Sequence, residues 1–261
     1  MSDDARFRLL ILGGTTEAAA LARALAGRPG IEVISSLAGR TREPAPLPGG
    51  TRSGGFGGVA GLVDYLRAER IAAVIDATHP FAAQIGSHAV AAARAAGLPL
   101  LRLERPPWRR LPGDRWIEVG SLAEAAVAAP KFGRRGFLTV GAGELQPFAG
   151  LATMRFLVRL IERPTAPLPL ADAKVVLGRG PFAAADEEKL LRQHAIEVIV
   201  AKNSGGDATY GKIAAARTLG LPVVMVRRPA RAAADHQVET VAAALAWIAA
   251  LRPGGPPALL P

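Results

Sequence analysis

The chain has 261 residues, a formal net charge of +10 and no cysteine. The lack of cysteine excludes disulfides, thiolate metal sites and cysteine nucleophiles. The length allows one large domain or two ordinary ones, with 50% hydrophobic residues to form cores. Basic residues are spread along the chain and no recognition helix, RRM or KH pattern is visible, which argues against nucleic-acid binding. The excess charge therefore reflects either the base composition of the gene or a polycarboxylate ligand.

The first predicted unit is a strand, a glycine turn and a helix. Residues 8–12, Arg-Leu-Leu-Ile-Leu, form a short and mainly apolar strand, and an Ala- and Leu-rich helix follows the next five residues. The turn consists of Gly13, Gly14, Thr15, Thr16 and Glu17. This arrangement is typical of a helix N-terminus that meets a phosphate, although it lacks the full GxGxxG pattern. The alternative is a tight turn with Thr15 or Thr16 as N-cap.

The second predicted strand, residues 31–35, is followed by Ser36 and by Arg40 in a loop. In Rossmann-like units an acid at this strand end selects NAD, and an arginine accommodates the 2′-phosphate of NADP. No acid occupies this strand end, so the sequence favours NADP. The alternative for Arg40 is a solvated loop arginine.

A glycine-rich segment precedes the next helix, with Gly55, Phe56 and Gly57 at its centre. Four glycines around one phenylalanine predict unusual backbone dihedrals or a close approach to a ligand. The alternative is a flexible surface loop. The second half repeats the feature in the GRGPF segment at residues 178–182, which a shared structural turn would also explain.

Residues 71–106 return as residues 194–229, shifted by 123 positions. Both copies run from an apolar strand through a polar turn into an Ala-rich helix, then Gly-Leu-Pro, a second strand and Arg-Pro. The turns differ, with Thr78, His79, Pro80 and Phe81 in the first copy and residues 201–206 in the second. His79 is either a proton donor, a partner for a cofactor amide or a structural histidine before a proline.

The domain boundary is predicted near residue 130. A short strand at 116–119 and a helix at 121–130 resemble in kind the segment from 236 to 251, so each half is expected to end with such a pair. The predicted domains are residues 1–130 and 131–252, followed by a disordered Pro- and Gly-rich tail at 253–261.

Five segments together resemble one family: GGTTEA, DATHPFA, ERPPW, GRGPF and the block from KNSGG to VRRP. They are colinear over nearly the whole chain, and the chain resembles the precorrin-6A reductase family of cobalamin biosynthesis. The resemblance implies an α/β fold of two pseudo-symmetric Rossmann-like domains with parallel sheets and NADPH in an interdomain cleft. It implies hydride transfer to one double bond of precorrin-6A, giving precorrin-6B. It also supplies a polycarboxylate tetrapyrrole as the ligand that the positive charge would attract.

With this resemblance the candidate residues receive roles. The first domain is expected to bind NADPH. Its cofactor-binding residues are Gly13, Gly14, Thr15, Thr16 and Glu17 at the pyrophosphate, Ser36 and Arg40 at the 2′-phosphate, Gly55, Phe56 and Gly57 at the adenosine, and Thr78, His79 and Pro80 at the nicotinamide. The second domain is expected to bind the tetrapyrrole through Lys202, Ser204, Gly205, Lys212 and Arg227.

Lys202 and His79 are the expected catalytic residues. Lys202 is either the proton donor that the reduction needs or a carboxylate anchor, and the anchor is favoured; water is the alternative proton source. We expect a cytoplasmic protein without a metal, a membrane segment or a nucleic-acid partner, and a monomer is compatible with the sequence. Two other functions fit less well, namely an NADP(H)-sensing protein without turnover and a non-redox two-domain tetrapyrrole enzyme.

Overall fold

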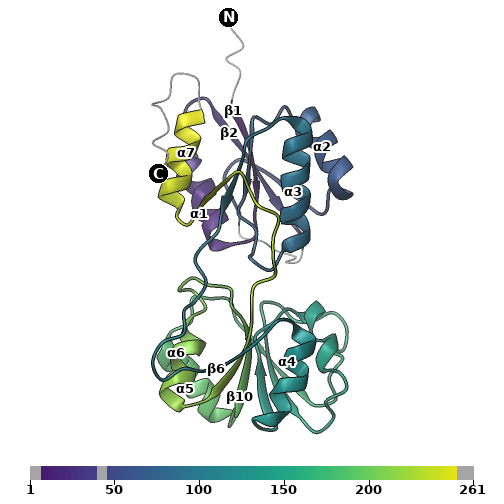
Figure 1. The fold of residues 1–261 in the computed structure, drawn as a ribbon, viewed down its shortest axis with the longest axis vertical. Coiled ribbons are helices and arrows are strands. Elements are labelled where there is room, and N and C mark those ends of the chain that lie inside the picture. Colours follow the sequence, from purple (N-terminus) through teal and green to yellow (C-terminus); the bar gives the residue numbers. More distant parts are fainter. Residues whose placement is uncertain (1–6, 40–45, 252–261) are drawn as a thin grey trace, which may run out of the picture. The chain divides into compact units, whose positions relative to one another are not determined.

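A computed structural model describes residues 7–39 and 46–251 of the chain (Figure 1). The chain forms two compact units. Unit 1 comprises Met1–Arg105 together with Ala230–Pro261, and unit 2 comprises Pro106–Pro229. The predicted boundary near residue 130 is therefore wrong, and the C-terminal part of the chain belongs to the first unit. The predicted tail at 253–261 lies outside the described residues.

Unit 1 is a six-stranded parallel sheet in the order β12-β5-β4-β1-β2-β3. Its strands are β1 (Phe7–Leu12), β2 (Ile31–Leu37), β3 (Gly50–Ser53), β4 (Ala73–Asp76), β5 (Leu100–Leu103) and β12 (His236–Val238). Its helices are α1 (Thr16–Leu25), α2 (Gly58–Ala68), α3 (Ala83–Ala96) and α7 (Val241–Leu251).

Alternation along the strands of unit 1 builds two cores, one on each face of the sheet. Leu9 and Ile11 of β1 pack in a cluster with α1 and α7, whereas Leu10 and Leu12 pack in a cluster with α2 and α3. Figure 1 shows these helix pairs on opposite sides of the sheet. Strands that are apolar on both faces are the expected pattern for a buried parallel sheet.

Unit 2 repeats this strand order as β6-β11-β10-β7-β8-β9, again with every pair parallel. Its strands are β6 (Arg115–Val119), β7 (Arg135–Leu138), β8 (Arg155–Leu160), β9 (Ala173–Leu177), β10 (Val198–Lys202) and β11 (Pro222–Val226). Its helices are α4 (Leu122–Ala128), α5 (Ala184–Gln193) and α6 (Gly211–Leu219), with 3₁₀ turns at Ala129–Lys131, Ala142–Glu144 and Gln146–Phe148. The expected α/β fold of two parallel-sheet units is confirmed.

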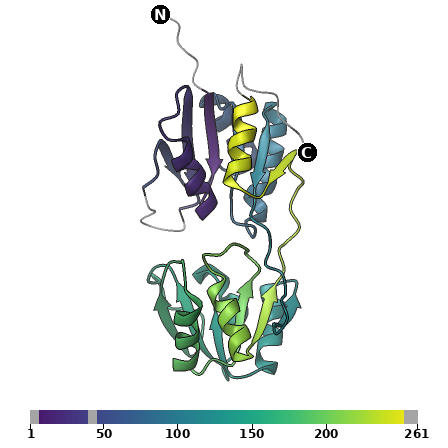
Figure 2. The ribbon, with the colours of Figure 1, turned by 90° about the vertical axis from the view of Figure 1, so that its left-hand side faces the viewer.

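The two units exchange their last strands, which explains the misplaced boundary. β6 directly follows unit 1 in sequence, but it pairs with β11 of unit 2. β12 follows unit 2, but it pairs with β5 of unit 1. Figure 2 shows the C-terminal strand and helix in the same unit as the N-terminal strands. Both strands are short and each is followed by an Ala-rich helix, so no local pattern indicates which sheet each one joins.

The sequence repeat has a clear structural counterpart. Gly97 and Gly220, at matching positions, end α3 and α6 with φ of 66° and 64°, and the next residue in each case bonds back to the helix. A glycine is favoured there because the left-handed conformation strains other residues. The Arg-Pro pairs that close the copies mark the two points where the chain passes between units.

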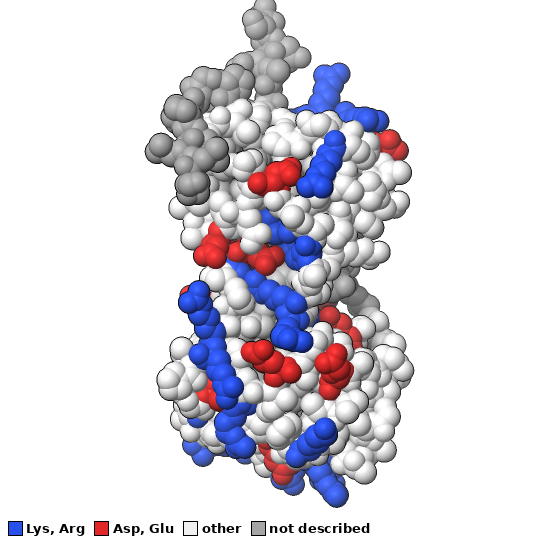
Figure 3. Space-filling model, in the orientation of Figure 1, with Lys and Arg blue, Asp and Glu red and all other residues white. Residues whose placement is uncertain are grey.

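The described residues combine a mixed surface charge with the lack of a membrane-spanning helix and of a metal-binding cluster. Figure 3 shows basic side chains spread over both units on one face, with acidic ones between them. No helix in residues 7–39 and 46–251 is long and apolar enough to cross a bilayer. In the same residues, no group of three or more His, Asp or Glu side chains is placed to hold a metal ion.

Candidate active site

The candidate site of unit 1 lies at the carboxyl ends of β1 and β4. The strand order reverses between these neighbours, since β1 continues to β2 on one side and the chain returns through β4 on the other. Open α/β sheets bind ligands at such a switch point. The turns that follow the two strands are the predicted glycine turn and the turn around His79.

Thr15 joins these two turns. It is the N-cap of α1, because its Oγ1 accepts a hydrogen bond of 3.1 Å from the Ala18 amide. The same hydroxyl donates to the Ala77 carbonyl at 2.8 Å. Gly14 has a φ of 104° and turns the chain into the helix. The first turn of α1 therefore follows a glycine turn at the switch point, as a phosphate-binding helix N-terminus requires.

The side chain of Glu17 is engaged by another residue of unit 1. Its carboxylate forms an ion pair of 2.7 Å with Arg105, the last residue of the first segment of unit 1. This pairing neutralises an acid that would repel a pyrophosphate from the first turn of α1. Glu17 is thus a partner of Arg105, and only its backbone remains a candidate for the phosphate.

The glycine-rich segment after β3 has the unusual backbone that its composition predicts. Gly54 and Gly57 have φ of 101° and 78°, and Gly57 is the N-cap of α2. The Phe56 ring packs edge-on against Tyr65, with 5.2 Å between ring centroids. An added Cβ at Gly55 would meet no atom within 4 Å. The segment forms a turn with left-handed glycines that leads directly into α2.

Arg52 is a residue that the sequence interpretation missed. It lies on β3 directly beside Ser36 of β2, and its Nη1 donates to the Ser36 hydroxyl at 2.7 Å. Ser36 is therefore placed at the strand end as expected, but its observed partner is Arg52. Arg40, the predicted partner, lies outside the described residues. β3 contains no apolar residue, so the hydrophobic pattern of the sequence does not predict this strand. Only the register between β2 and β3 places Arg52 beside Ser36.

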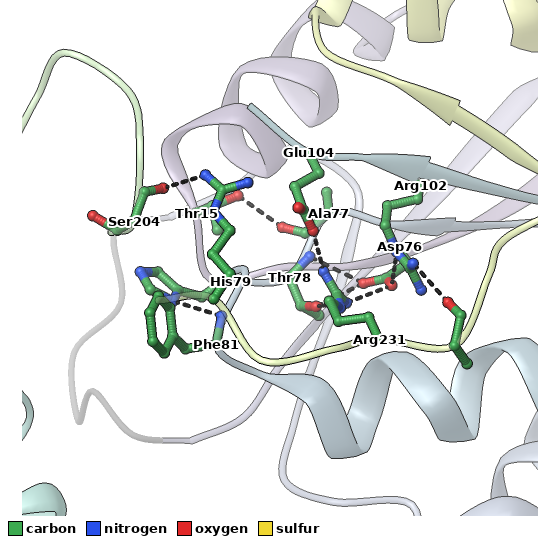
Figure 4. A network of polar contacts seen from close by, with 12 residues as sticks. Thr15, Asp76, Ala77, Thr78, His79, Phe81, Arg102, Glu104, Ser204 and Arg231 are labelled. Atoms are coloured by element: carbon green, nitrogen blue, oxygen red, sulfur yellow. Dashed lines mark hydrogen bonds and ion pairs between the residues drawn. The ribbon is translucent and has the colours of Figure 1, made fainter. Parts of the chain in front are cut away.

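The turn after β4 is fixed by a buried polar network (Figure 4). Oδ1 of Asp76 accepts from the Thr78 hydroxyl at 2.6 Å and from the Thr78 amide at 3.3 Å. Oδ2 accepts from Arg102 at 3.1 Å and from Arg231 at 2.7 Å. Arg231 also donates to Thr78 and to Glu104. The charges of two acids and two arginines thus balance in the interior, and Thr78 is held by three hydrogen bonds to Asp76 and Arg231.

His79 has a defined hydrogen-bonding pattern. Its Nδ1 accepts from the Phe81 amide at 3.2 Å, so the proton of the neutral imidazole lies on Nε2. Its carbonyl accepts from the Ala82 amide at 2.7 Å, and Pro80 between them is buried. The turn therefore fixes the His79 ring through Nδ1, and in the neutral form Nε2 is the nitrogen that donates.

The switch point of unit 2 lies between β7 and β10, and a carboxylate of the chain itself fills it. Glu144 accepts from the Gly141 amide at 2.8 Å, and both its oxygens accept from the Lys202 ammonium, at 2.9 and 2.7 Å. A 3₁₀ turn stands where unit 1 has α1. Unit 2 therefore lacks a helix N-terminus for a phosphate at this position, although Lys202 holds a carboxylate there.

The turn that follows Lys202 is tied to the segment at 106–108. Asn203 pairs with the backbone of Trp108 in both directions, at 2.8 and 3.0 Å. Arg228 donates to the carbonyls of Asn203 and Ser204, at 3.0 and 3.1 Å. Gly205 has a φ of 70°, and an added Cβ would overlap the Pro106 carbonyl oxygen. Ser204 and Gly205 therefore belong to a rigid turn beside Lys202.

Lys212 and Arg227 are placed differently from each other. Lys212 is buried at the start of α6, donates to the Thr209 carbonyl at 2.6 Å and lies 4.9 Å from the Trp108 ring centroid. Burial lowers the pKa of Lys212 to about 7. An ammonium so enclosed is not exposed to a substrate carboxylate, which corrects the predicted role. Arg227 is exposed at the end of β11 and remains a candidate.

Comparison with known proteins identifies the family. The profile of the family described as "Precorrin-6x reductase CbiJ/CobK" matches residues 8–249, which span both units. The chain belongs to this family. A precorrin-6A reductase of Rhodococcus erythropolis is 50% identical over 94% of this chain and 98% of its own. A precorrin-6A reductase of Rhodobacter capsulatus is 49% identical over 93% of this chain and 96% of its own.

A solved structure of the family agrees in fold as well as in sequence. The structure titled "CobK precorrin-6A reductase" superimposes with a TM-score of 0.89 at 46% identity, covering 97% of this chain and 98% of that one. The similarity includes both units. The suspected resemblance is thereby confirmed.

Proposed function

We propose that this protein reduces one carbon–carbon double bond of precorrin-6A with NADPH to give precorrin-6B in cobalamin biosynthesis. The observation that carries the proposal is the contrast between the two switch points. Unit 1 has a glycine turn and a capped helix N-terminus, whereas unit 2 has Glu144 and Lys202 in the corresponding place. One unit is suited to a dinucleotide and the other to a carboxylate. The relatives named precorrin-6A reductase support this reading.

Unit 1 is the proposed cofactor domain. The pyrophosphate would lie over the turn from Gly13 to Thr16, where backbone amides and the helix dipole favour an anion. The pairing of Glu17 with Arg105 keeps a negative side chain from opposing it. Gly55 to Gly57 would flank the adenosine. The turn from Thr78 to Pro80, across the switch point, would receive the nicotinamide.

NADPH supplies the hydride when bound, and the protein must hold the nicotinamide against the reacting carbon. His79 is suited to this task, because its Nε2–H can donate to the carbonyl oxygen of the carboxamide. The buried network around Asp76 fixes the neighbouring Thr78 and thereby the turn. We assign His79 as an orienting residue for the ring.

Lys202 is proposed to anchor a carboxylate of the substrate. Its ammonium already binds one carboxylate, that of Glu144, so a substrate acid would compete for an existing site. The rigid turn at Asn203 and Ser204 holds the end of β10 in place. Arg227, exposed at the end of the neighbouring strand β11, would supply a second positive charge.

The decisive experiment follows NADPH absorbance after purified protein is mixed with precorrin-6A, with substrate-free and protein-free mixtures as controls. We expect oxidation of NADPH and formation of a product two hydrogens heavier. NADPH binding without oxidation would instead support a sensor. Conversion of the tetrapyrrole without NADPH would support a non-redox enzyme.

The His79→Gln variant retains a hydrogen-bond donor and should keep more reductase activity than His79→Phe.

A further inference from the structure

The guanidinium of Arg52 stands at the position where a Rossmann-like unit meets the ribose of adenosine. Arg52 lies on β3 and is paired in register with Ser36, the next-to-last residue of β2. Its Nη1 donates to the Ser36 hydroxyl at 2.7 Å and to the Gly54 carbonyl at 3.1 Å. Its Nη2 donates to the Gly55 carbonyl at 2.9 Å. The side chain is thus fixed by neutral acceptors at the end of the second strand.

The glycine-rich turn provides this fixed placement. Positive φ at Gly54, Gly57 and Gly58 directs two carbonyls towards the guanidinium. The Phe56 ring lies beneath it, with 3.8 Å between Cζ and the ring centroid. A stacked and hydrogen-bonded arginine loses little further conformational freedom when it binds an anion.

Unit 2 contains a comparable arginine whose charge is already neutralised. Arg159 lies 4.0 Å from the ring centroid of Phe182, in the matching glycine turn. It forms two hydrogen bonds with the buried Glu187 carboxylate, at 2.9 and 2.6 Å. Arg52 has no such carboxylate among the residues that the structure describes. Of the two units, unit 1 alone therefore keeps an arginine of this kind with an unbalanced charge in that described part.

The bonds of Arg52 also leave one edge of the guanidinium available. An arginine has five N–H donors, and three are used for Ser36, Gly54 and Gly55. The Nε–H and one Nη2–H have no partner within residues 7–39 and 46–251. Nε and Nη2 flank one edge of the guanidinium, and this is an edge at which an arginine can bind two oxygens of a phosphate.

We propose that Arg52 binds the 2′-phosphate of NADPH and is the residue that selects NADPH over NADH. This proposal rests on the proposed function, because it needs the cofactor in unit 1. The Ser36 hydroxyl, held by Arg52, supplies a further polar contact at the same point. The absence of an acid at the end of β2 removes the group that would prefer a free ribose hydroxyl.

The experiment compares two fragments of the cofactor, adenosine 2′,5′-bisphosphate and adenosine 5′-monophosphate, by titration calorimetry. They differ only in the 2′-phosphate, so the ratio of their dissociation constants reports on this contact without turnover. We expect Arg52→Gln to reduce the preference for the bisphosphate by about tenfold to a hundredfold. Arg52→Lys should lie between, because it keeps the charge and loses the fork. The control, Arg94→Gln, removes an exposed arginine of α3 and should change nothing.

The outcomes distinguish a failure of this proposal from a failure of the proposed function. A wild-type protein that binds neither fragment would contradict the cofactor site of unit 1 and the proposal with it. A wild-type preference that survives in Arg52→Gln within about twofold would overturn the role of Arg52 alone. Equal weakening of both fragments would assign Arg52 a merely structural role. The monophosphate affinity of the variant therefore serves as the test of its fold.

Discussion

Replacing Asp76 by asparagine should destabilise unit 1 strongly. Its side chain is fully buried, and the side chains of its partners Arg102 and Arg231 are only 4% and 7% exposed. Both carboxylate oxygens accept from donors, Oδ1 from Thr78 and Oδ2 from the two arginines. An asparagine in either orientation would therefore set its NH₂ group against donors and leave a buried positive charge.

The expected loss is large because a broken buried ion pair leaves its partner unpaired in the interior. Removing one partner of such a pair costs about 3–5 kcal/mol of unfolding free energy, or roughly 6–20 °C in Tm for a protein of this size. Urea unfolding followed by circular dichroism measures the free energy. Hydrogen exchange of the amides of β4 and β5 would locate the loss in unit 1.

The matched control for Asp76 is Asp235→Asn. Asp235 pairs with Arg94, and these side chains are 51% and 62% exposed. A solvent-exposed pair contributes at most about 1 kcal/mol. The burial argument is refuted if the two variants unfold with free energies within about 1 kcal/mol of each other.

Three other measurements test the structure. Gly205→Ala should destabilise more than Gly220→Ala in urea; both pay about 1–2 kcal/mol for a left-handed backbone, and only the first also overlaps Pro106. The pKa of Lys212 is lowered to about 7 by burial, so the unfolded chain binds more protons and stability rises from about pH 7 to pH 10. Lys212→Met should flatten that rise; an unchanged slope would contradict it. Lys202→Ala should weaken tetrapyrrole binding and keep a near-normal single-turnover rate at saturation, whereas a loss of about a hundredfold would identify a proton donor.

Local features of the fold were predictable from the sequence. The repeated Gly-Leu-Pro segments end two helices because Gly97 and Gly220 take a left-handed conformation, which depends on adjacent residues alone. The glycine turn before α1 and its N-cap Thr15 follow from the same kind of local chemistry. Strand, turn and helix were therefore recognised where neighbouring residues determine them.

Features that depend on distant pairing were not predictable. Arg231 reaches Asp76 from 155 positions along the chain, and no local pattern indicates that contact. β3 has no apolar residue, so the hydrophobic pattern did not reveal it or place Arg52 beside Ser36. The strand exchange between the units depends on the pairing of β6 with β11 and of β12 with β5, which are distant in sequence. Long-range register was thus the missing information.

The exchange of β6 and β12 sets the order in which the nascent chain can be completed. Unit 2 is one continuous segment, so all of its strands leave the ribosome by Val226. In unit 1, synthesis of β5 ends at Leu103, but its neighbour β12 starts only at His236. At ordinary rates of synthesis this delay is on the order of ten seconds. The sheet of unit 1, most of whose strands are made first, is therefore completed last. Until β12 pairs with it, the edge of β5 is unpaired and prone to aggregation.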